Sequence, residues 1–163
     1  MPSFDIVNKM DLQKIDNAVN TAKKELLNRY DLKDDMCSIE LDKKGNLIKL
    51  EARQEMALQT LIDIILGKFS KQQLDVRLLD LSNEPRPSGR LMLQDMKIKE
   101  GIEKEVAKKI TNYIKGKNPK LQAAINDDQV RVTGKNIDDL QEMISHLRGE
   151  DFDVPLQFEN FRS

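Results

Sequence analysis

The sequence contains no tryptophan, a single cysteine and a single histidine. One cysteine, Cys37, cannot form a disulfide framework or a zinc or redox site of the CxxC type. One histidine, His146, is too few for a metal site with several histidine ligands, and it makes a histidine-based catalytic triad improbable in such a chain. We therefore expect no metal site and no resident cofactor.

Signals for secretion and membrane insertion are also missing, because the N-terminal residues lack a basic flank and no apolar run is long enough to span a bilayer. The charges are nearly balanced, with 27 Lys and Arg against 28 Asp and Glu and a net charge of −1. This balance excludes a uniformly basic surface for nucleic acid but leaves room for a local basic patch. We expect a cytoplasmic protein that does not bind membranes.

Known catalytic and phosphate-binding motifs do not occur. The pair Gly134-Lys135 is not part of a GxxxxGK[ST] loop, since Gln129 stands where that motif needs its first glycine. There is no GxGxxG after a strand, and no HExxH, GxSxG or kinase motif. Carboxylates are plentiful, but none forms a recognisable pair for acid–base catalysis. The sequence therefore predicts a protein without catalytic residues.

An internal repeat of about half the chain is present instead. Apolar residues of the first half recur in the second, with a spacing of 84 in the pair Ala22 and Val106 and of 82 in the pair Leu58 and Leu140. The change of spacing lies in a predicted hairpin, where a change of length disturbs packing least. Because the match extends over a helix, a hairpin and a second helix, we interpret the chain as a tandem duplication.

Each copy changes between strand and helix periodicity in the same order. The first copy has a strand over 4–7, a helix over 15–26, a hairpin over 37–52, a helix over 58–69 and a strand over 74–78. The second has a strand over 92–98, a helix over 101–115, a hairpin around 126–128, a helix over 137–148 and a strand over 155–161. The order βαββαβ, read twice, predicts an α+β fold of two ferredoxin-like domains, each an antiparallel sheet with helices on one face. We predict these domains at 1–81 and 90–163, joined by a linker at 82–89.

The sheet face without helices is the place where we expect a binding site. Alternation places Lys97 and Lys99 on this face of one central strand of the second copy, and Arg131, Thr133 and Lys135 on that of the other. Cations on adjacent strands lie within reach of one phosphate group, which Arg can bind through two hydrogen bonds. We therefore predict a nucleotide-binding site formed by these five residues. The alternative is a solvated polar surface, or one that docks against the other domain.

A second basic feature is a run of six lysines with a single acidic residue among them: Lys104, Lys108, Lys109, Lys115, Lys117 and Lys120. Such a ridge attracts RNA phosphates by counterion release. The alternative is a solvated helix balanced by the acidic segment 138–159. Base stacking of the kind seen on RNA-recognition sheets is not expected, because the predicted third strands, 48–53 and 130–135, contain no aromatic residue.

Several stretches of the sequence resemble the bacterial YajQ family. They are the opening MPSFDIV at 1–7, KIKEGIE at 97–103, QVRVTGK at 129–135 followed by DDLQ at 138–141, and PLQFENFR at 155–162. The resemblance covers essentially the whole chain.

This resemblance implies two ferredoxin-like domains whose last strands are exchanged, so that residues 155–161 complete the sheet begun by residues 4–8. It also implies nucleotide binding, with GTP, ATP or cyclic di-GMP as the ligand, and tRNA, a transcription regulator or another protein as partners. Some relatives have a His before Ser-Gly and a Trp on the following strand, where this sequence has Pro87 and Met92. A purine that stacks on that Trp has no such partner here, whereas phosphate contacts from the basic residues are unaffected.

Three functions are consistent with these observations. The first is a non-enzymatic nucleotide-binding protein that acts as a nucleotide-responsive or cyclic di-GMP-responsive regulator. The second is a protein–protein adaptor whose nucleotide affinity is incidental. The third is a tRNA- or ribosome-associated factor that binds RNA through the lysine run, and strong dependence of its binding on salt would distinguish it from the other two.

Overall fold

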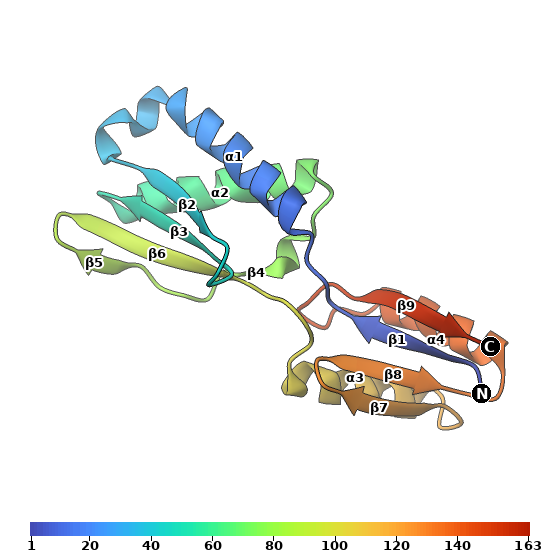
Figure 1. Cartoon of the computed structure of the whole chain (residues 1–163). Coiled ribbons are helices and arrows are strands. Elements are labelled where there is room, and N and C mark those ends of the chain that lie inside the picture. The colour runs from blue at the N-terminus through green and yellow to red at the C-terminus, as the bar shows by residue number, and fades with distance from the viewer. The chain divides into compact units, whose positions relative to one another are not determined.

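The computed structural model describes all 163 residues and divides the chain into two compact units (Figure 1). Unit 1 consists of Met1–Lys9 and Glu100–Ser163, and unit 2 is the continuous segment Met10–Lys99. In each unit two α-helices cover one face of an antiparallel sheet, and the other face carries no helix. The predicted α+β class and the ferredoxin-like arrangement are confirmed.

Unit 2 contains the helices α1 and α2 and the strands β2 to β6. Their bounds are α1 Leu12–Leu27, β2 Ser38–Asp42, β3 Leu47–Ala52, α2 Glu55–Lys71, β4 Leu79–Asp80, β5 Arg86–Ser88 and β6 Leu91–Ile98, with short 3-10 helices η1 at Tyr30–Asp35 and η2 at Val76–Leu78. The strand order is β2-β3-β6-β4, and β5 pairs with the first three residues of β6. The predicted linker at 82–89 therefore contributes a strand to a hairpin.

The last strand of the first copy differs from its prediction. Residues 74–78 do not form a strand: the Asp75 carboxylate accepts a hydrogen bond from the backbone N–H of Arg77 and caps a 3-10 turn there. The strand β4 follows with only two residues. Apolar alternation alone does not distinguish the two structures over so short a segment.

Unit 1 contains β1 Ser3–Val7, α3 Lys104–Lys117, β7 Gln122–Asn126, β8 Gln129–Thr133, α4 Ile137–Arg148 and β9 Gln157–Arg162. The strand order is β7-β8-β1-β9, so the N-terminal strand lies in the centre of a sheet that is otherwise built from the last third of the chain. The predicted pairing of the N-terminal strand with the C-terminal one is present, with Asp5 opposite Glu159.

The exchanged strands are nevertheless the first strands of the two copies, and the expectation that the last strands are exchanged is wrong. β1 lies between β8 and β9, while β6 lies between β3 and β4. The predicted boundaries 1–81 and 90–163 consequently do not coincide with the units. The physical reason is that the two first strands offer the same apolar alternation, at Phe4 and Ile6 in one and at Met96 and Ile98 in the other, so either pattern suits either sheet.

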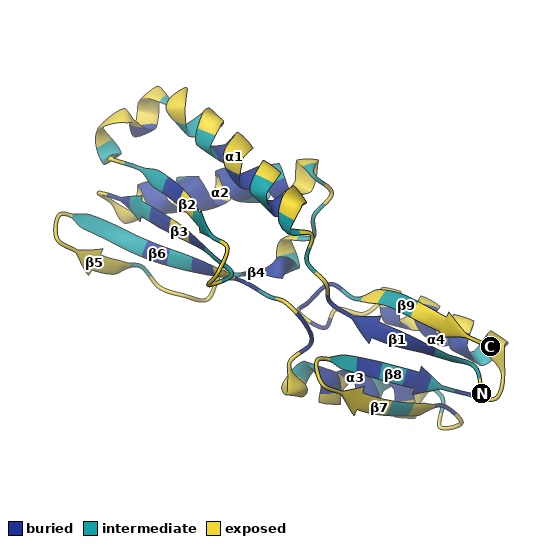
Figure 2. Ribbon diagram, in the orientation of Figure 1, coloured by how far each residue is buried: buried dark blue, intermediate teal, exposed yellow.

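Each unit has its own hydrophobic core between its sheet and its helices. In unit 2, Leu50 of β3 and Met96 of β6 pack with Leu61 of α2, and all three are fully or almost fully buried. In unit 1, Ile6 of β1 and Val132 of β8 belong to the corresponding core and are fully buried. Figure 2 shows β1 and much of α2 as buried. Each fully buried side chain of this size contributes about 1.5–3 kcal/mol to stability, and none of the helices is both long and apolar enough to cross a membrane.

Candidate functional site

The five residues predicted to bind phosphate lie on two different sheets. Lys97 and Lys99 lie at the end of β6 in unit 2, and β6 pairs with β3 and β4. Arg131 and Thr133 lie on β8 in unit 1, which pairs with β1 and β7, and Lys135 follows β8. β6 and β8 are therefore not neighbours in one sheet, and the five residues do not share one sheet face.

The predicted faces of these residues agree with the structure. On β6 the neighbours Met96 and Ile98 are buried against the helices, so Lys97 between them faces the helix-free side. On β8 the buried Val130 and Val132 place Arg131 on the helix-free face of the unit 1 sheet in the same way. The faces followed from the sequence alone because alternation needs no knowledge of the neighbouring strand.

Arg131 is engaged by a carboxylate that the sequence analysis did not single out. Its Nε and Nη2 donate hydrogen bonds of 2.8 and 3.2 Å to Asp5, which is directly opposite on β1, and Asn160 of β9 donates a third of 2.9 Å. The Asp5 side chain is only 6% exposed, and the hydrogen bond from Arg131 lowers the pKa of its carboxyl although burial opposes this shift. Arg131 is thus neutralised within the sheet. The signal in the sequence was an acidic residue in the middle of an apolar strand.

Lys97 and Lys99 have different surroundings on the helix-free face of unit 2. Lys97 is exposed and lies opposite Asp80 of β4, while Lys99 is half-buried. The pKa of Asp80 is lowered mainly by hydrogen bonds from the side chain and backbone of Ser82, and then by the positive charges of Lys99 and Lys97. The positive charges of both lysines therefore act on the same carboxylate at this corner of the sheet.

The rest of this face alternates in charge from strand to strand. Glu40 of β2 faces Lys49 of β3, which faces Asp95 of β6, and Arg86 of β5 forms an ion pair of 3.1 Å with Asp95. Carboxylates rather than a ligand thus relieve the repulsion among these cations. Three half-buried leucines, Leu47, Leu91 and Leu93, share the face and provide apolar surface.

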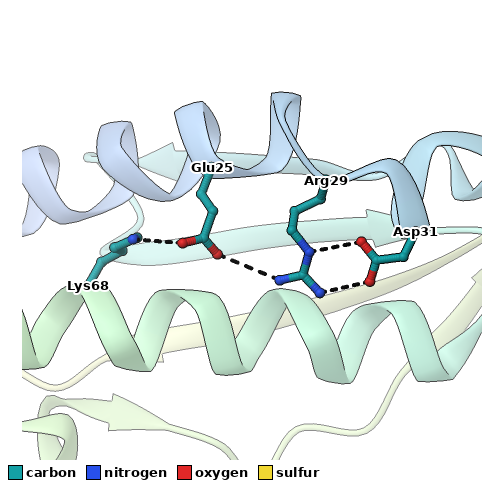
Figure 3. A network of polar contacts seen from close by, with 4 residues as sticks. All are labelled: Glu25, Arg29, Asp31 and Lys68. Atoms are coloured by element: carbon teal, nitrogen blue, oxygen red, sulfur yellow. Dashed lines mark hydrogen bonds and ion pairs between the residues drawn. The ribbon is translucent and has the colours of Figure 1, made fainter.

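A groove of about 530 Å³ runs along the helices α1 and α2 of unit 2. Figure 3 shows a network that includes three of its charged residues: Lys68 binds Glu25 at 2.8 Å, Arg29 binds the neighbouring Asp31 at 2.7 Å, and Arg29 also approaches Glu25 at 3.7 Å. Lys68 lowers the pKa of the Glu25 carboxyl through their hydrogen bond. These charges satisfy one another and tie α1 to α2, so we assign the network a structural role.

The lysine run of the second copy lies on α3 and just after it. Five of the lysines are exposed and take part in no ion pair: Lys104, Lys108, Lys109, Lys115 and Lys120. Lys117 instead lies 5.8 Å from the centre of the Tyr113 ring. The opposite side of α3 is held in the core by Ile110 and Ile114, which fixes the lysines toward solvent. No three His, Cys, Asp or Glu side chains lie close enough together to hold a metal ion.

The fold and these surfaces define a small α+β protein made of two ferredoxin-like units, each with one sheet face free of helices. The chain belongs to the family described as "Nucleotide-binding protein YajQ-like", whose model matches residues 2–162.

Relatives from several bacteria are similar over their full length. A protein of Cytophaga hutchinsonii is 46% identical over 162 residues, covering 99% of this chain and 100% of the relative. A protein of Nitratidesulfovibrio vulgaris is 48% identical over 164 residues, and one of Citrifermentans bemidjiense is 46% identical over 163 residues, each covering 100% of both chains. All three are named nucleotide-binding protein. The resemblance found in the sequence is confirmed.

Proposed function

We propose that this protein binds a nucleotide by its phosphates on the helix-free face of unit 2, at Lys97 and Lys99, and carries out no reaction on it. The names of its relatives support nucleotide binding. The observation that carries the choice of site is the position of Lys97, which is exposed on the helix-free face opposite Asp80, with the positive charge of Lys99 acting on the same carboxylate. In contrast, Arg131 of unit 1 is already engaged by Asp5.

The geometry suggests how a phosphate is held. The backbone and hydroxyl of Ser82 donate hydrogen bonds to the Asp80 carboxylate and keep it in place at the edge of the sheet. A phosphate group approaching from solvent then meets the exposed Lys97 and, beside it, Lys99. Charge-assisted hydrogen bonds from ammonium groups to phosphate oxygens are stronger than neutral ones. Because the site is open to water, salt weakens the binding.

The base contributes little at this site. The face carries leucines but no aromatic residue, and Met92, at the position where some relatives have Trp, packs against the hydrophobic core on the opposite side of β6. A ligand without a stacking partner depends on its phosphates. We therefore expect GTP and ATP, with three phosphates, to bind more tightly than cyclic di-GMP. The protein acts as a nucleotide-responsive regulator if a protein partner recognises the face with its nucleotide bound.

A panel of GTP, ATP, cyclic di-GMP and inorganic tripolyphosphate, measured by thermal shift and calorimetry, tests this proposal. A ligand at a hundred times its dissociation constant adds about 2.7 kcal/mol of stability. The double variant K97Q/K99Q loses this stabilisation, and the control K115Q/K120Q, which removes two exposed charges from α3 and the residues after it, keeps it. Equal stabilisation of the wild type and K97Q/K99Q would place the ligand elsewhere.

The five unpaired lysines of unit 1 support a second candidate function, the binding of RNA. If tRNA binds along α3, the logarithm of its affinity falls linearly with the logarithm of the salt concentration, by about 0.7–0.9 for each phosphate neutralised. In the variant K104Q/K108Q/K115Q, the slope of log affinity against log salt concentration is then smaller in magnitude by about two units. An unchanged slope excludes α3 as the RNA-binding surface.

A further inference from the structure

A small pocket of about 250 Å³ lies in unit 1 between the end of β9 and the first half of α4. Its lining is largely apolar, with Ile137, Leu140 and Ile144 from α4 and Phe161 from β9. Leu140 and Ile144 are almost fully buried, whereas Ile137 is 48% exposed, so the pocket has a closed floor and an open rim. Figure 1 labels the two elements, α4 and β9.

Phe161 forms one wall of this pocket and is the exposed member of a stacked pair. Its ring lies 6.1 Å from that of Phe4, with 29° between the planes, and Phe4 is completely buried. Phe161 itself is 63% exposed, unlike the other phenylalanines of the chain. One face of its ring thus lies toward the buried ring of Phe4, and the rest of the ring is exposed. An exposed ring placed in this way is a platform on which a planar ligand can stack.

The rim of the pocket carries polar side chains that are accessible to a ligand. The amide of Gln141 and the hydroxyl of Ser3 line it, and neither side chain makes a hydrogen bond within the protein. Acidic residues, Asp138 and Asp139, follow Ile137 in the first turn of α4 and repel phosphate groups from this end of the helix. Arg162 also lines the pocket, so its rim combines a cation with an amide and a hydroxyl, and the pocket suits a flat ring with donors and acceptors along its edge.

From this combination we infer that the pocket binds the base of a purine nucleoside, stacked on Phe161 and hydrogen-bonded at its edge by Gln141. Stacking of a base on an aromatic side chain is tolerant of sequence, whereas a side-chain amide can pair with an adenine edge through two hydrogen bonds. The inference rests on the proposed function in one respect, which is that the ligand is taken to be a nucleotide. The pocket is built from unit 1 alone, whereas Lys97 and Lys99 belong to unit 2.

An NMR titration of the full chain with isoleucine methyl labelling tests the pocket directly. Adenosine and guanosine, which carry no phosphate, are added at millimolar concentration, and inorganic tripolyphosphate is added in a separate experiment. We expect the nucleosides to shift the methyl signals of Ile137 and Ile144. In Phe161→Ala their affinity falls about fivefold or more, the loss typical of one base stack.

Two further variants separate stacking from a structural effect. Phe161→Leu keeps an apolar side chain and removes the flat ring, so it too weakens the nucleoside. Tyr30→Ala removes another exposed aromatic side chain, which is 89% exposed in unit 2, and leaves the affinity unchanged. Wild-type affinity in Phe161→Leu would overturn the stacking assignment, and the methyl spectrum of each variant shows that it is folded.

The outcomes also separate this inference from the proposed function. If tripolyphosphate binds at Lys97 and Lys99 while neither nucleoside shifts the methyl signals, the pocket proposal is wrong and the phosphate site stands. If the nucleosides bind in the pocket while tripolyphosphate binds nowhere, the phosphate site is wrong and the pocket stands.

Discussion

Asp5 and Arg131 are separated by 126 residues in the chain and lie directly opposite each other on β1 and β8, joined by two hydrogen bonds. Asn160 of β9 binds the same carboxylate, so one buried acidic group links three neighbouring strands. A shift of β1 by one residue would move Phe4 and Ile6 to the helix-free face and break this set of bonds. The pair therefore fixes the register of a strand that comes from the far end of the chain.

Replacing Asp5 by Asn tests this role. The substitution keeps the size of the side chain but removes the charge that holds the guanidinium of Arg131, and it leaves polar groups of the sheet imperfectly paired. We expect the free energy of unfolding of unit 1 to fall by about 2 kcal/mol, as for a lost hydrogen bond to a charged group. Glu40→Gln, which removes an exposed ion pair with Lys23, is the control and has little effect. Similar losses in both variants would deny Asp5 a special role.

The same carboxylate gives stability a predictable dependence on pH. Because Arg131 lowers the pKa of Asp5 in the folded protein, its contribution is complete above the ordinary pKa of about 4 and is lost as the pH falls through the lower, folded-state pKa. The stability difference between the wild type and Asp5→Asn should therefore be largest at neutral pH and shrink below pH 4. Urea unfolding at several pH values measures it, and a difference that stays constant down to pH 2 contradicts the assignment.

The exchange of first strands predicts which fragments fold. Residues 10–99 contain every strand and helix of unit 2, so this fragment should unfold cooperatively on its own. Residues 100–163 lack β1, which lies between β8 and β9, and should remain unfolded.

Restoring β1 should rescue the second fragment. The backbone N–H of Gly101 bonds the carbonyl of Asn8 at 2.8 Å, so a short linker can join residue 9 to residue 100 in place of unit 2. Circular dichroism during thermal unfolding reports on all three chains. A cooperative transition in residues 100–163 alone would show that β1 is dispensable, contrary to the observed sheet.

Gly101 itself is required by its backbone conformation. Its φ is +77°, and a Cβ atom there would lie 2.7 Å from a carboxylate oxygen of Asp128. We expect Gly101→Ala to destabilise unit 1 by about 1–3 kcal/mol. Gly67, in the interior of α2, has nothing within 4 Å of the same position, so Gly67→Ala should stabilise unit 2 by about 0.5–1 kcal/mol. Calorimetric unfolding distinguishes the opposite signs, and equal effects would show that neither backbone argument holds.

The helices and the sheet faces could be predicted because they depend on local periodicity. The buried residues of α1, α2, α3 and α4 repeat at helical spacing, and the central strands alternate cleanly. The partner of each central strand could not be predicted in this way. Phe4 and Ile6 present the same pattern as Met96 and Ile98, and Asp5 opposite Arg131 has a counterpart in Asp95 opposite Lys49, so neither pattern distinguishes the two sheets.

The candidate site was affected by the same ambiguity. With β6 assumed to lie beside β8, Lys97 and Arg131 appeared to share one phosphate, whereas β1 and its Asp5 stand in that place. The neighbour of Lys97 is Asp80, from a strand that begins after the predicted one. Phe161 was passed over as a site residue because one exposed aromatic on an edge strand has no periodic signal of its own.

The central claim is that phosphates are held at the end of β6, and an amide NMR titration of the full chain with GTP examines it most directly. We expect the largest shifts at residues 80–82 and 97–99, and their disappearance in K97Q/K99Q. Shifts concentrated at residues 129–135 of unit 1, with the end of β6 unmoved, would contradict the account.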